Sequence, residues 1–199
     1  GKYFHGVGDV YCAVGIPDGG YEAFHWFAGR YVLLEITTRD EPVELSRWQL
    51  TATGYPLAAT GNFSPAGPDA PAYDALKALM LRTLKNCMHQ TYMDCPYFER
   101  LMYVGDTRLE VLVTYVLSRD RQLPRHALLT FHDSLAGMEL IQARYPSHCA
   151  QMIPPFALWW IAMVHDYACW NDEPELIGRM LPAVRRILAF FQMADASAG

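Results

Sequence analysis

The sequence lacks a basic cluster, a long apolar run and a recognisable signal peptide. Its 199 residues carry 16 basic and 21 acidic side chains, a formal net charge of −5, which argues against nucleic acid or an anionic membrane surface as a partner. The apolar stretch at residues 153–164 is too short to cross a bilayer and contains two prolines. With no export signal at the start of the sequence, we expect a cytoplasmic location.

The five cysteines are odd in number and widely spaced, and no two of them form a Cys-x-x-Cys pair. They indicate neither a disulfide framework nor a zinc knuckle, so we expect reduced thiols. His148 and Cys149, with His165, Asp166 and Cys169, are metal-ligand residue types whose spacing fits no zinc pattern. The alternative interpretation is a buried, hydrogen-bonded histidine on an aromatic-rich helix, and we expect no metal site.

Apolar residues, in contrast, are abundant: 52% of the chain is hydrophobic and 13% is aromatic, which is rich for a single small domain. The surplus of aromatic side chains indicates that some of their packing partners lie elsewhere. Apolar helix faces left uncovered would then favour self-association.

The pattern of the chain changes near residue 70. Before it, runs at 9–16, 23–37 and 43–52 are rich in strand formers and broken by turn residues, which predicts antiparallel strands. Within them, residues 31–36 alternate as a half-buried strand would. Residues 61–71 contain five glycines or prolines and are typical of a linker.

Helical periodicity dominates the rest of the sequence. It predicts helices joined by short loops, so that neighbours are antiparallel. Asp106 and Asp172 are the expected N-cap residues of two of them. The predicted helices cover residues 72–88, 107–119, 121–131, 134–144, 155–170 and 174–193.

Three carboxylates, Asp94, Glu99 and Asp106, fall within thirteen residues, each beside aromatic or turn-forming neighbours. Carboxylates accept hydrogen bonds from sugar hydroxyls, rings cover the C–H faces of sugars, and a glycosidic bond breaks only with help from an acid. Crowded like charges raise the pKa of at least one acid, and Glu99, among apolar neighbours, is our candidate. The alternative is a loop residue, a helix cap and a solvated pair between Glu99 and Arg100.

The stretch Asp94-Cys-Pro-Tyr-Phe-Glu99, followed by Tyr103-Val-Gly-Asp106-Thr-Arg108, resembles the acid-loop motif of α-L-rhamnosidases of glycoside hydrolase family 78. Other segments resemble that family in the same order, whereas the first fifty or so residues do so only loosely. This chain has a shorter acid loop than many members. The further matching segments lie at residues 55–63, 83–93 and 145–160.

The resemblance implies a mainly α fold, part of an (α/α)6 six-hairpin toroid preceded by the end of an antiparallel β-sandwich. Residues 1–60 would be the β-sandwich portion and residues 61–71 the linker. Residues 72–199 would be the N-terminal part of the catalytic toroid.

The resemblance also implies roles for individual residues. Glu99 corresponds to the general acid, and Asp94 and Asp106 correspond to acids that bind the sugar hydroxyls. Tyr103 falls where the family places a ring beside the sugar. Arg100 would hold the loop through an aspartate, bond to a sugar hydroxyl, or do both.

Two further positions in the motif regions carry alternatives. Phe156, or Trp159 in its place, could form an apolar wall against the C6 methyl of a deoxy sugar, and Trp160 is expected to be core. Arg108 would pair with Asp94, Asp106 or Glu110 and so hold the loop, bond to a sugar hydroxyl, or do both.

The implied function is hydrolysis of terminal α-L-rhamnosyl bonds in a rhamnosylated glycoside or oligosaccharide, with inversion. Water is the nucleophile, and neither cofactor nor metal is implied. None of the remaining acids lies in a context that resembles the general base, so the base is expected outside this chain. The alternatives are a glycosidase of the same fold acting on another sugar, and a non-catalytic carbohydrate-binding fragment.

Overall fold

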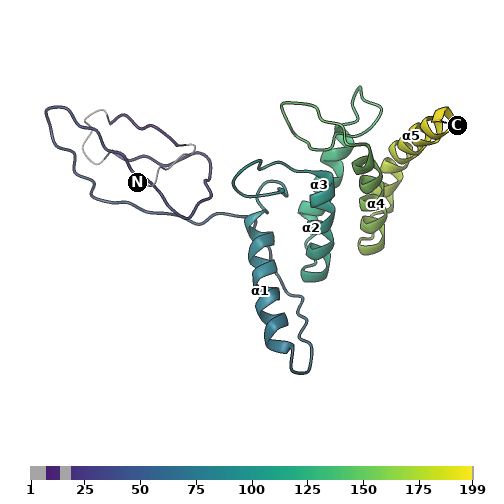
Figure 1. Ribbon diagram of the computed structural model, residues 1–199, viewed down its shortest axis with the longest axis horizontal. Coiled ribbons are helices and arrows are strands. Elements are labelled where there is room, and N and C mark those ends of the chain that lie inside the picture. The colour runs from purple at the N-terminus through teal and green to yellow at the C-terminus, as the bar shows by residue number, and fades with distance from the viewer. Residues whose placement is uncertain (1–7, 14–18, 199) are drawn as a thin grey trace. The chain divides into compact units, whose positions relative to one another are not determined.

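The computed structural model describes residues 8–13 and 19–198. The chain divides into two compact units, residues 1–53 and residues 54–199. Five α-helices, all in the second unit, make up the regular structure of the described residues (Figure 1).

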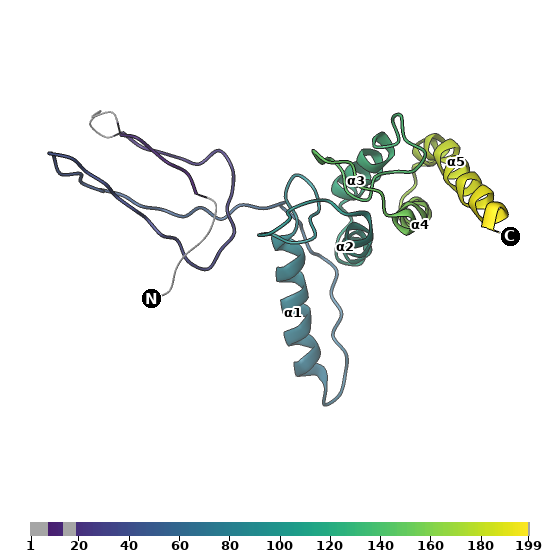
Figure 2. The ribbon, with the colours of Figure 1, turned by 45° about the horizontal axis from the view of Figure 1, so that its top comes forward.

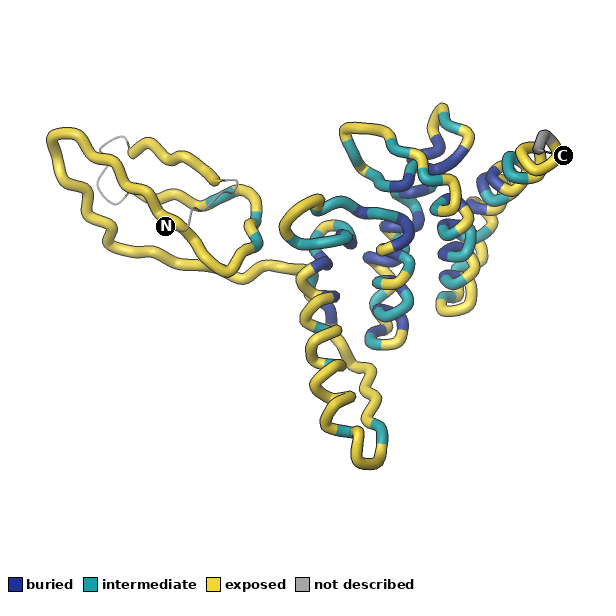
Figure 3. Tube along the Cα trace, in the orientation of Figure 1, coloured by how far each residue is buried: buried dark blue, intermediate teal, exposed yellow. Residues whose placement is uncertain are grey.

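The described residues of the first unit contain no assigned strand and are almost all exposed (Figure 3). The half-buried strand predicted at residues 31–36 is wrong, because neighbouring side chains are exposed alike instead of alternating between buried and exposed. Tyr31 is 76% exposed and Val32 is 59% exposed. Strands need a ladder partner and a covered face to be stable, and this unit covers neither face. Residues 14–16 of the first predicted run lie outside the described residues, and the β-sandwich assignment stays a prediction.

The second unit contains helices at five of the six predicted positions. They are α1 (Ala70–Asn86), α2 (Val104–Leu117), α3 (Gln122–Asp133), α4 (Pro154–Trp170) and α5 (Pro174–Ala198). Helix α2 packs against α3 and α4, and α4 packs against α3 and α5 (Figures 1 and 2). The helices α2 to α5 alternate in direction (Figure 1). The connections from α2 to α3 and from α4 to α5 are short, as predicted, whereas the one from α3 to α4 is long.

The helix predicted at residues 134–144 is wrong, since the chain turns there instead. The Ser134 hydroxyl donates to the carbonyl of Phe131 at 2.6 Å and accepts the backbone N–H of Gln142 at 3.0 Å. Gly137 then takes a positive φ of 75°, a conformation that glycine adopts without steric cost. Helix α3 therefore ends, and residues 134–153 form a long irregular segment.

The core of the helical unit lies between α2, α3, α4 and α5. Trp160 is fully buried, and its indole N–H donates to the carbonyl of Leu128 at 3.2 Å, which confirms it as core. Other large side chains with almost no exposed surface are Tyr92, Phe131, Val111, Met180 and Ile187.

Two predicted helix caps are wrong. Helix α2 begins after Tyr103, whose backbone is extended, so Asp106 lies inside the first turn instead of at the cap. A carboxylate there is favoured by the helix dipole all the same. Helix α5 begins at Pro174, which makes Glu173, and not Asp172, the residue directly before it.

Residues 54–61 pack against the helical unit. The hydroxyl of Tyr55 donates to Asp120 Oδ2 at 2.6 Å, and Leu57 is buried. The backbone N–H groups of Thr60 and Gly61 donate to the carbonyl of Leu117 at 2.8 and 2.7 Å. A Cβ at Gly61 would lie 2.3 Å from a backbone oxygen, so this docking requires glycine.

Helices α1 and α5 are among those of the second unit that carry exposed apolar side chains. Leu76, Leu79 and Met80 lie exposed on α1, and Leu188 and Met193 on α5. These are the faces through which the predicted self-association would occur. No helix in the described part of the chain has the length and apolarity needed to cross a membrane.

Candidate active site

The acid loop is closed by the first of its carboxylates. The backbone N–H of Asp94 donates to the carbonyl of Leu101 at 3.0 Å, and Asp94 Oδ1 accepts the N–H of Leu101 at 2.9 Å. The N–H of Glu99 contacts the sulfur of Cys95 at 3.4 Å. Arg100 has a φ of 53°, a left-handed conformation that is uncommon outside glycine and tends to occur at functional loops.

Glu99 lies on the exposed side of this loop and is held by Tyr103. The Tyr103 hydroxyl donates to Glu99 Oε2 at 2.6 Å and accepts a hydrogen bond from Arg144 Nη1 at 2.9 Å. Tyr103, whose ring was expected beside the sugar, therefore contacts Glu99, the expected acid, through its hydroxyl. Arg144 was not among the predicted site residues, because it comes from the segment wrongly predicted as helix.

Asp106 lies in the first turn of α2, close to the other two acids of the motif. Burial raises the pKa of Asp106, with smaller contributions from the charges of Asp94 and Glu99. The three carboxylates of the motif thus share one electrostatic environment. This is the convergence that their spacing predicted.

Glu110 adds a fourth carboxyl, one turn after Asp106 on the same helix. Burial raises the pKa of Glu110 to about 9, and the charges of Asp106 and Asp94 act in the same direction. Its Oε2 atom is buried and has no hydrogen-bond partner among the described residues. Asp106 and Glu110 are thus the carboxyl groups of α2 whose pKa is raised. Glu110 was not among the predicted site residues, although its i to i+4 spacing from Asp106 was an available signal.

Phe156 lies directly against the first turn of α2. A Cβ built on Gly105 would be 2.7 Å from Cζ of the Phe156 ring, so the ring occupies the space that a side chain would need. The ring is partly buried against the core. The structure thus brings Phe156 to the turn that carries Asp106.

Arg108 points away from the acids of the motif, so the pairing predicted for it is wrong. Its Nε donates to Asp166 Oδ2 at 2.9 Å, and its guanidinium carbon lies 5.0 Å from the centroid of the Trp159 ring. Both partners belong to α4, against which α2 packs. Trp159 therefore lies beneath an arginine, which leaves Phe156 as the better candidate for a sugar wall.

The residues considered for metal binding do not form a ligand set. The sulfur of Cys169 lies 3.8 Å from His165 Nε2, and both side chains are exposed. Within the described ranges, no group of three or more histidine, cysteine or acidic side chains is arranged to hold a metal ion. All five cysteines are free.

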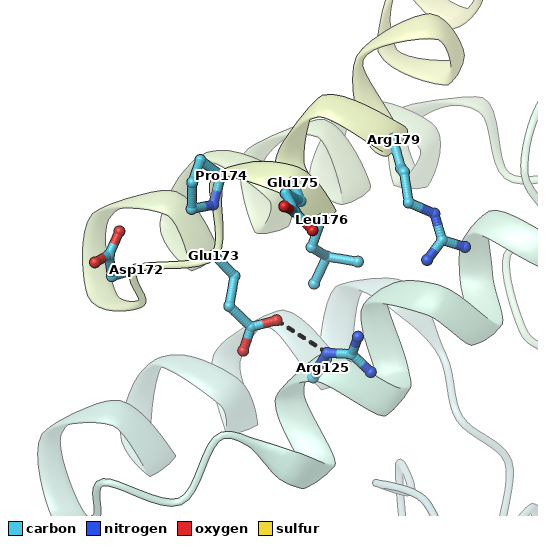
Figure 4. Close-up of a pocket in the computed structure, with 7 residues that line it drawn as sticks. All are labelled: Arg125, Asp172, Glu173, Pro174, Glu175, Leu176 and Arg179. Carbon is cyan, nitrogen blue, oxygen red and sulfur yellow. Dashed lines mark hydrogen bonds and ion pairs between the residues drawn. The ribbon is translucent and has the colours of Figure 1, made fainter.

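Two open cavities lie at the other end of the helices from the acid loop. One, of 340 Å³, is lined by Arg125, Arg179 and residues 172–176, and Arg125 Nε pairs with Glu173 Oε2 at 3.0 Å (Figure 4). The other, of 550 Å³, is lined by residues 115–121 and residues 170–172, among others. Neither of them includes an acid of the motif.

The fold matches two solved glycosidases. A family 78 rhamnosidase of Bacillus sp. GL1 is 28% identical over 69% of this chain, with a TM-score of 0.64. A rhamnosidase from Klebsiella oxytoca, solved with rhamnose bound, is 22% identical over 69% of this chain, with a TM-score of 0.54, and shows the fold alone. The matched parts are 14% and 26% of those chains, so this chain spans a small share of each.

The class defined by this fold is the six-hairpin glycosidase. Residues 59–189 match the family model of the bacterial α-L-rhamnosidase six-hairpin glycosidase domain, and the chain belongs to that family. The predicted fold class, a mainly helical part of a six-hairpin domain, is confirmed. No curated protein matches the chain.

Proposed function

We propose that this chain provides the general acid of an α-L-rhamnosidase that cleaves terminal α-L-rhamnosyl bonds with inversion. The observation that carries the proposal is the position of Glu99, hydrogen-bonded by Tyr103 at 2.6 Å beside Asp94 and Asp106, in a chain of the rhamnosidase family. A general acid needs hydrogen-bond reach to the leaving oxygen, and Glu99 is exposed enough to offer it.

The two oxygens of Glu99 have different surroundings. Oε2 accepts the hydroxyl of Tyr103, whereas Oε1 has no hydrogen bond among the described residues. The acid proton is therefore placed on Oε1, from which it passes to the glycosidic oxygen as the bond from that oxygen to the anomeric carbon breaks. A water molecule attacks the opposite face of the sugar and gives its proton to a second carboxylate.

That second carboxylate is expected about 6.5 to 9.5 Å from the acid in an inverting enzyme. We assign it to a residue outside this chain. The carboxylates of Asp94 and Asp106 bind the sugar hydroxyls. Asp94 Oδ1 accepts the backbone N–H of Leu101 within the loop, and Asp94 Oδ2 accepts a hydrogen bond from a sugar hydroxyl.

Phe156 and Tyr103 are the apolar surfaces for the sugar. The Phe156 ring packs on the turn that carries Asp106, and the Tyr103 ring lies next to Glu99. An aromatic wall fits the C6 methyl group of rhamnose, the sugar bound to the Klebsiella oxytoca rhamnosidase. A glycosidase of this fold acting on another sugar, and a non-catalytic carbohydrate-binding fragment, are the competing functions.

The test is hydrolysis of p-nitrophenyl α-L-rhamnopyranoside against a panel of other p-nitrophenyl glycosides. This chain and the native-length protein are compared, each with Glu99→Gln and with Glu139→Gln, an exposed carboxyl outside the motif. In the native-length protein we expect Glu99→Gln to lower kcat by about 10²- to 10⁴-fold and Glu139→Gln to leave it unchanged.

The other outcomes of this assay distinguish the competing functions. Cleavage of a different glycoside with the same dependence on Glu99 would retain the glycosidase and overturn the sugar. Sugar binding without turnover in the native-length protein would favour the carbohydrate-binding alternative. Rhamnoside hydrolysis that survives Glu99→Gln would overturn Glu99 as the acid.

A further inference from the structure

Tyr103 and Arg144 lie opposite each other where residues 134–153 meet the start of α2. They form an isolated antiparallel bridge, flanked by hydrogen bonds from Val104 N–H to the carbonyl of Ala143 at 2.9 Å and from Tyr145 N–H to the carbonyl of Met102 at 3.2 Å. Residues directly opposite in such a pair place their side chains on the same face. The backbone alone therefore sets the arginine beside the phenol.

The guanidinium of Arg144 makes its contacts with that phenol. Nη1 donates to the Tyr103 hydroxyl at 2.9 Å, and the guanidinium carbon lies 5.6 Å from the ring centroid. The Nε atom is buried and has no hydrogen-bond partner among the described residues. A buried N–H without a partner is costly. The Nε atom therefore does not stabilise arginine at this position, and the contact with Tyr103 is the interaction left to explain it.

The hydrogen bonds run in one direction, from Arg144 through Tyr103 to Glu99. A guanidinium only donates, so it occupies an acceptor position of the phenol oxygen, and the phenol donates its own hydrogen to Glu99 Oε2 at 2.6 Å. The hydrogen bond to Glu99 is the largest of the effects that raise the pKa of Tyr103, which keeps the phenol protonated and able to donate.

We propose that Arg144 is a positioning residue for Glu99 that acts through Tyr103. By occupying the acceptor side of the phenol, it directs the phenol hydrogen to Oε2 and leaves the acid proton to Oε1. This inference rests on the proposed function, in which Glu99 is the general acid. Without Arg144, the phenol turns and accepts the proton of Glu99, which is then withheld from the leaving oxygen.

A double-mutant cycle in the native-length protein tests this order of action. The variants are Arg144→Met, Tyr103→Phe and the pair together, with Arg82→Met, an exposed arginine of α1, as the control. The substrate is whichever p-nitrophenyl glycoside the protein cleaves best. We expect each single change to lower kcat by about tenfold with little change in KM, and the pair to be no slower than Tyr103→Phe alone.

Arg144→Lys distinguishes a lost hydrogen bond from a folding defect. Lysine keeps a cationic donor, so this variant should have a higher kcat than Arg144→Met. Effects of the two single changes that multiply in the pair would overturn the proposal, since Arg144 would then act independently of Tyr103. A wild-type kcat in Arg144→Met would also overturn it.

A second readout is independent of turnover. Arg144 lowers the pKa of Tyr103 and so opposes the effect of Glu99; Arg144→Met should therefore move ionisation of this phenol to higher pH. NMR of isotope-labelled tyrosine, with the signal assigned by Tyr103→Phe, measures it. An unchanged titration would overturn the coupling, whereas the absence of any glycoside cleavage with a shifted titration would refute the proposed function alone.

Discussion

Gly105 lies directly beneath the ring of Phe156, with the position of a Cβ only 2.7 Å from the ring Cζ. The glycine of the acid motif therefore has a packing reason to lack a side chain. It lets α4 bring an aromatic ring to the turn that carries Asp106.

Substitution of this glycine should disturb the contact between the two helices. Gly105→Ala is expected to destabilise the protein by about 1 to 3 kcal/mol, because the added methyl group forces the ring away. Thermal unfolding measures the change, and Gly178→Ala in α5 is the matched control, since nothing lies within 4 Å of its Cβ position. Equal stability of Gly105→Ala and wild type would refute the close contact, and Gly105→Ala combined with Phe156→Leu should recover stability.

Glu110 should make the stability of the fold depend on pH. Its pKa is raised from 4.5 to about 9 in the folded state, so the folded state binds more protons than the unfolded state between these values. The free energy of unfolding should then fall as pH rises through this window, by at most about 1.4 kcal/mol per pH unit from this group. Glu110→Gln should flatten the slope, as measured by urea unfolding at a series of pH values. A slope that persists in Glu110→Gln would assign the dependence to other groups.

Asp94 has two separable tasks, closing the loop and binding the sugar. Asp94→Asn keeps the oxygen that accepts the N–H of Leu101 and removes the charge. We expect it to lower kcat/KM by about tenfold or more with little change in Tm, whereas Asp94→Ala should lower both. If Asp94→Asn cleaved as well as wild type, the charge would have no part in sugar binding.

Tyr55 should hold residues 54–61 on the helical unit. Its hydroxyl donates to Asp120 at 2.6 Å, and burial, followed by this hydrogen bond, raises the pKa of Tyr55 to about 12. Tyr55→Phe is expected to cost about 1 to 3 kcal/mol, because the hydrogen bond is to a charged group, and to speed proteolysis of the segment. Tyr73→Phe on the exposed side of α1 is the control, and equal proteolysis of the two variants would show that residues 54–61 are held by other contacts.

Much of the helical architecture was predictable because its causes are local. Prolines at or near the starts of α1, α4 and α5 and the apolar period of each helix act over one or two turns. The order and spacing of Asp94, Glu99 and Asp106 are likewise properties of the chain, and they indicated the family. The strands predicted at residues 23–37 and 43–52 are absent, because a strand needs partners that periodicity does not supply.

The partners of the charged groups were decided by tertiary structure. Packing of α2 on α4 brings Arg108 to Asp166 instead of to the acids of the motif, whereas Glu110 loses contact with solvent on the side of α2 that faces Cys87 and Tyr92. The turn that replaced the predicted helix at residues 134–144 brings Arg144 to Tyr103. The sequence by itself determined that Asp94, Glu99 and Asp106 would lie near one another, since one short loop and one helix turn carry them. Only tertiary structure decided which cation meets which acid and which carboxyl is buried, because those contacts join segments that lie far apart along the chain.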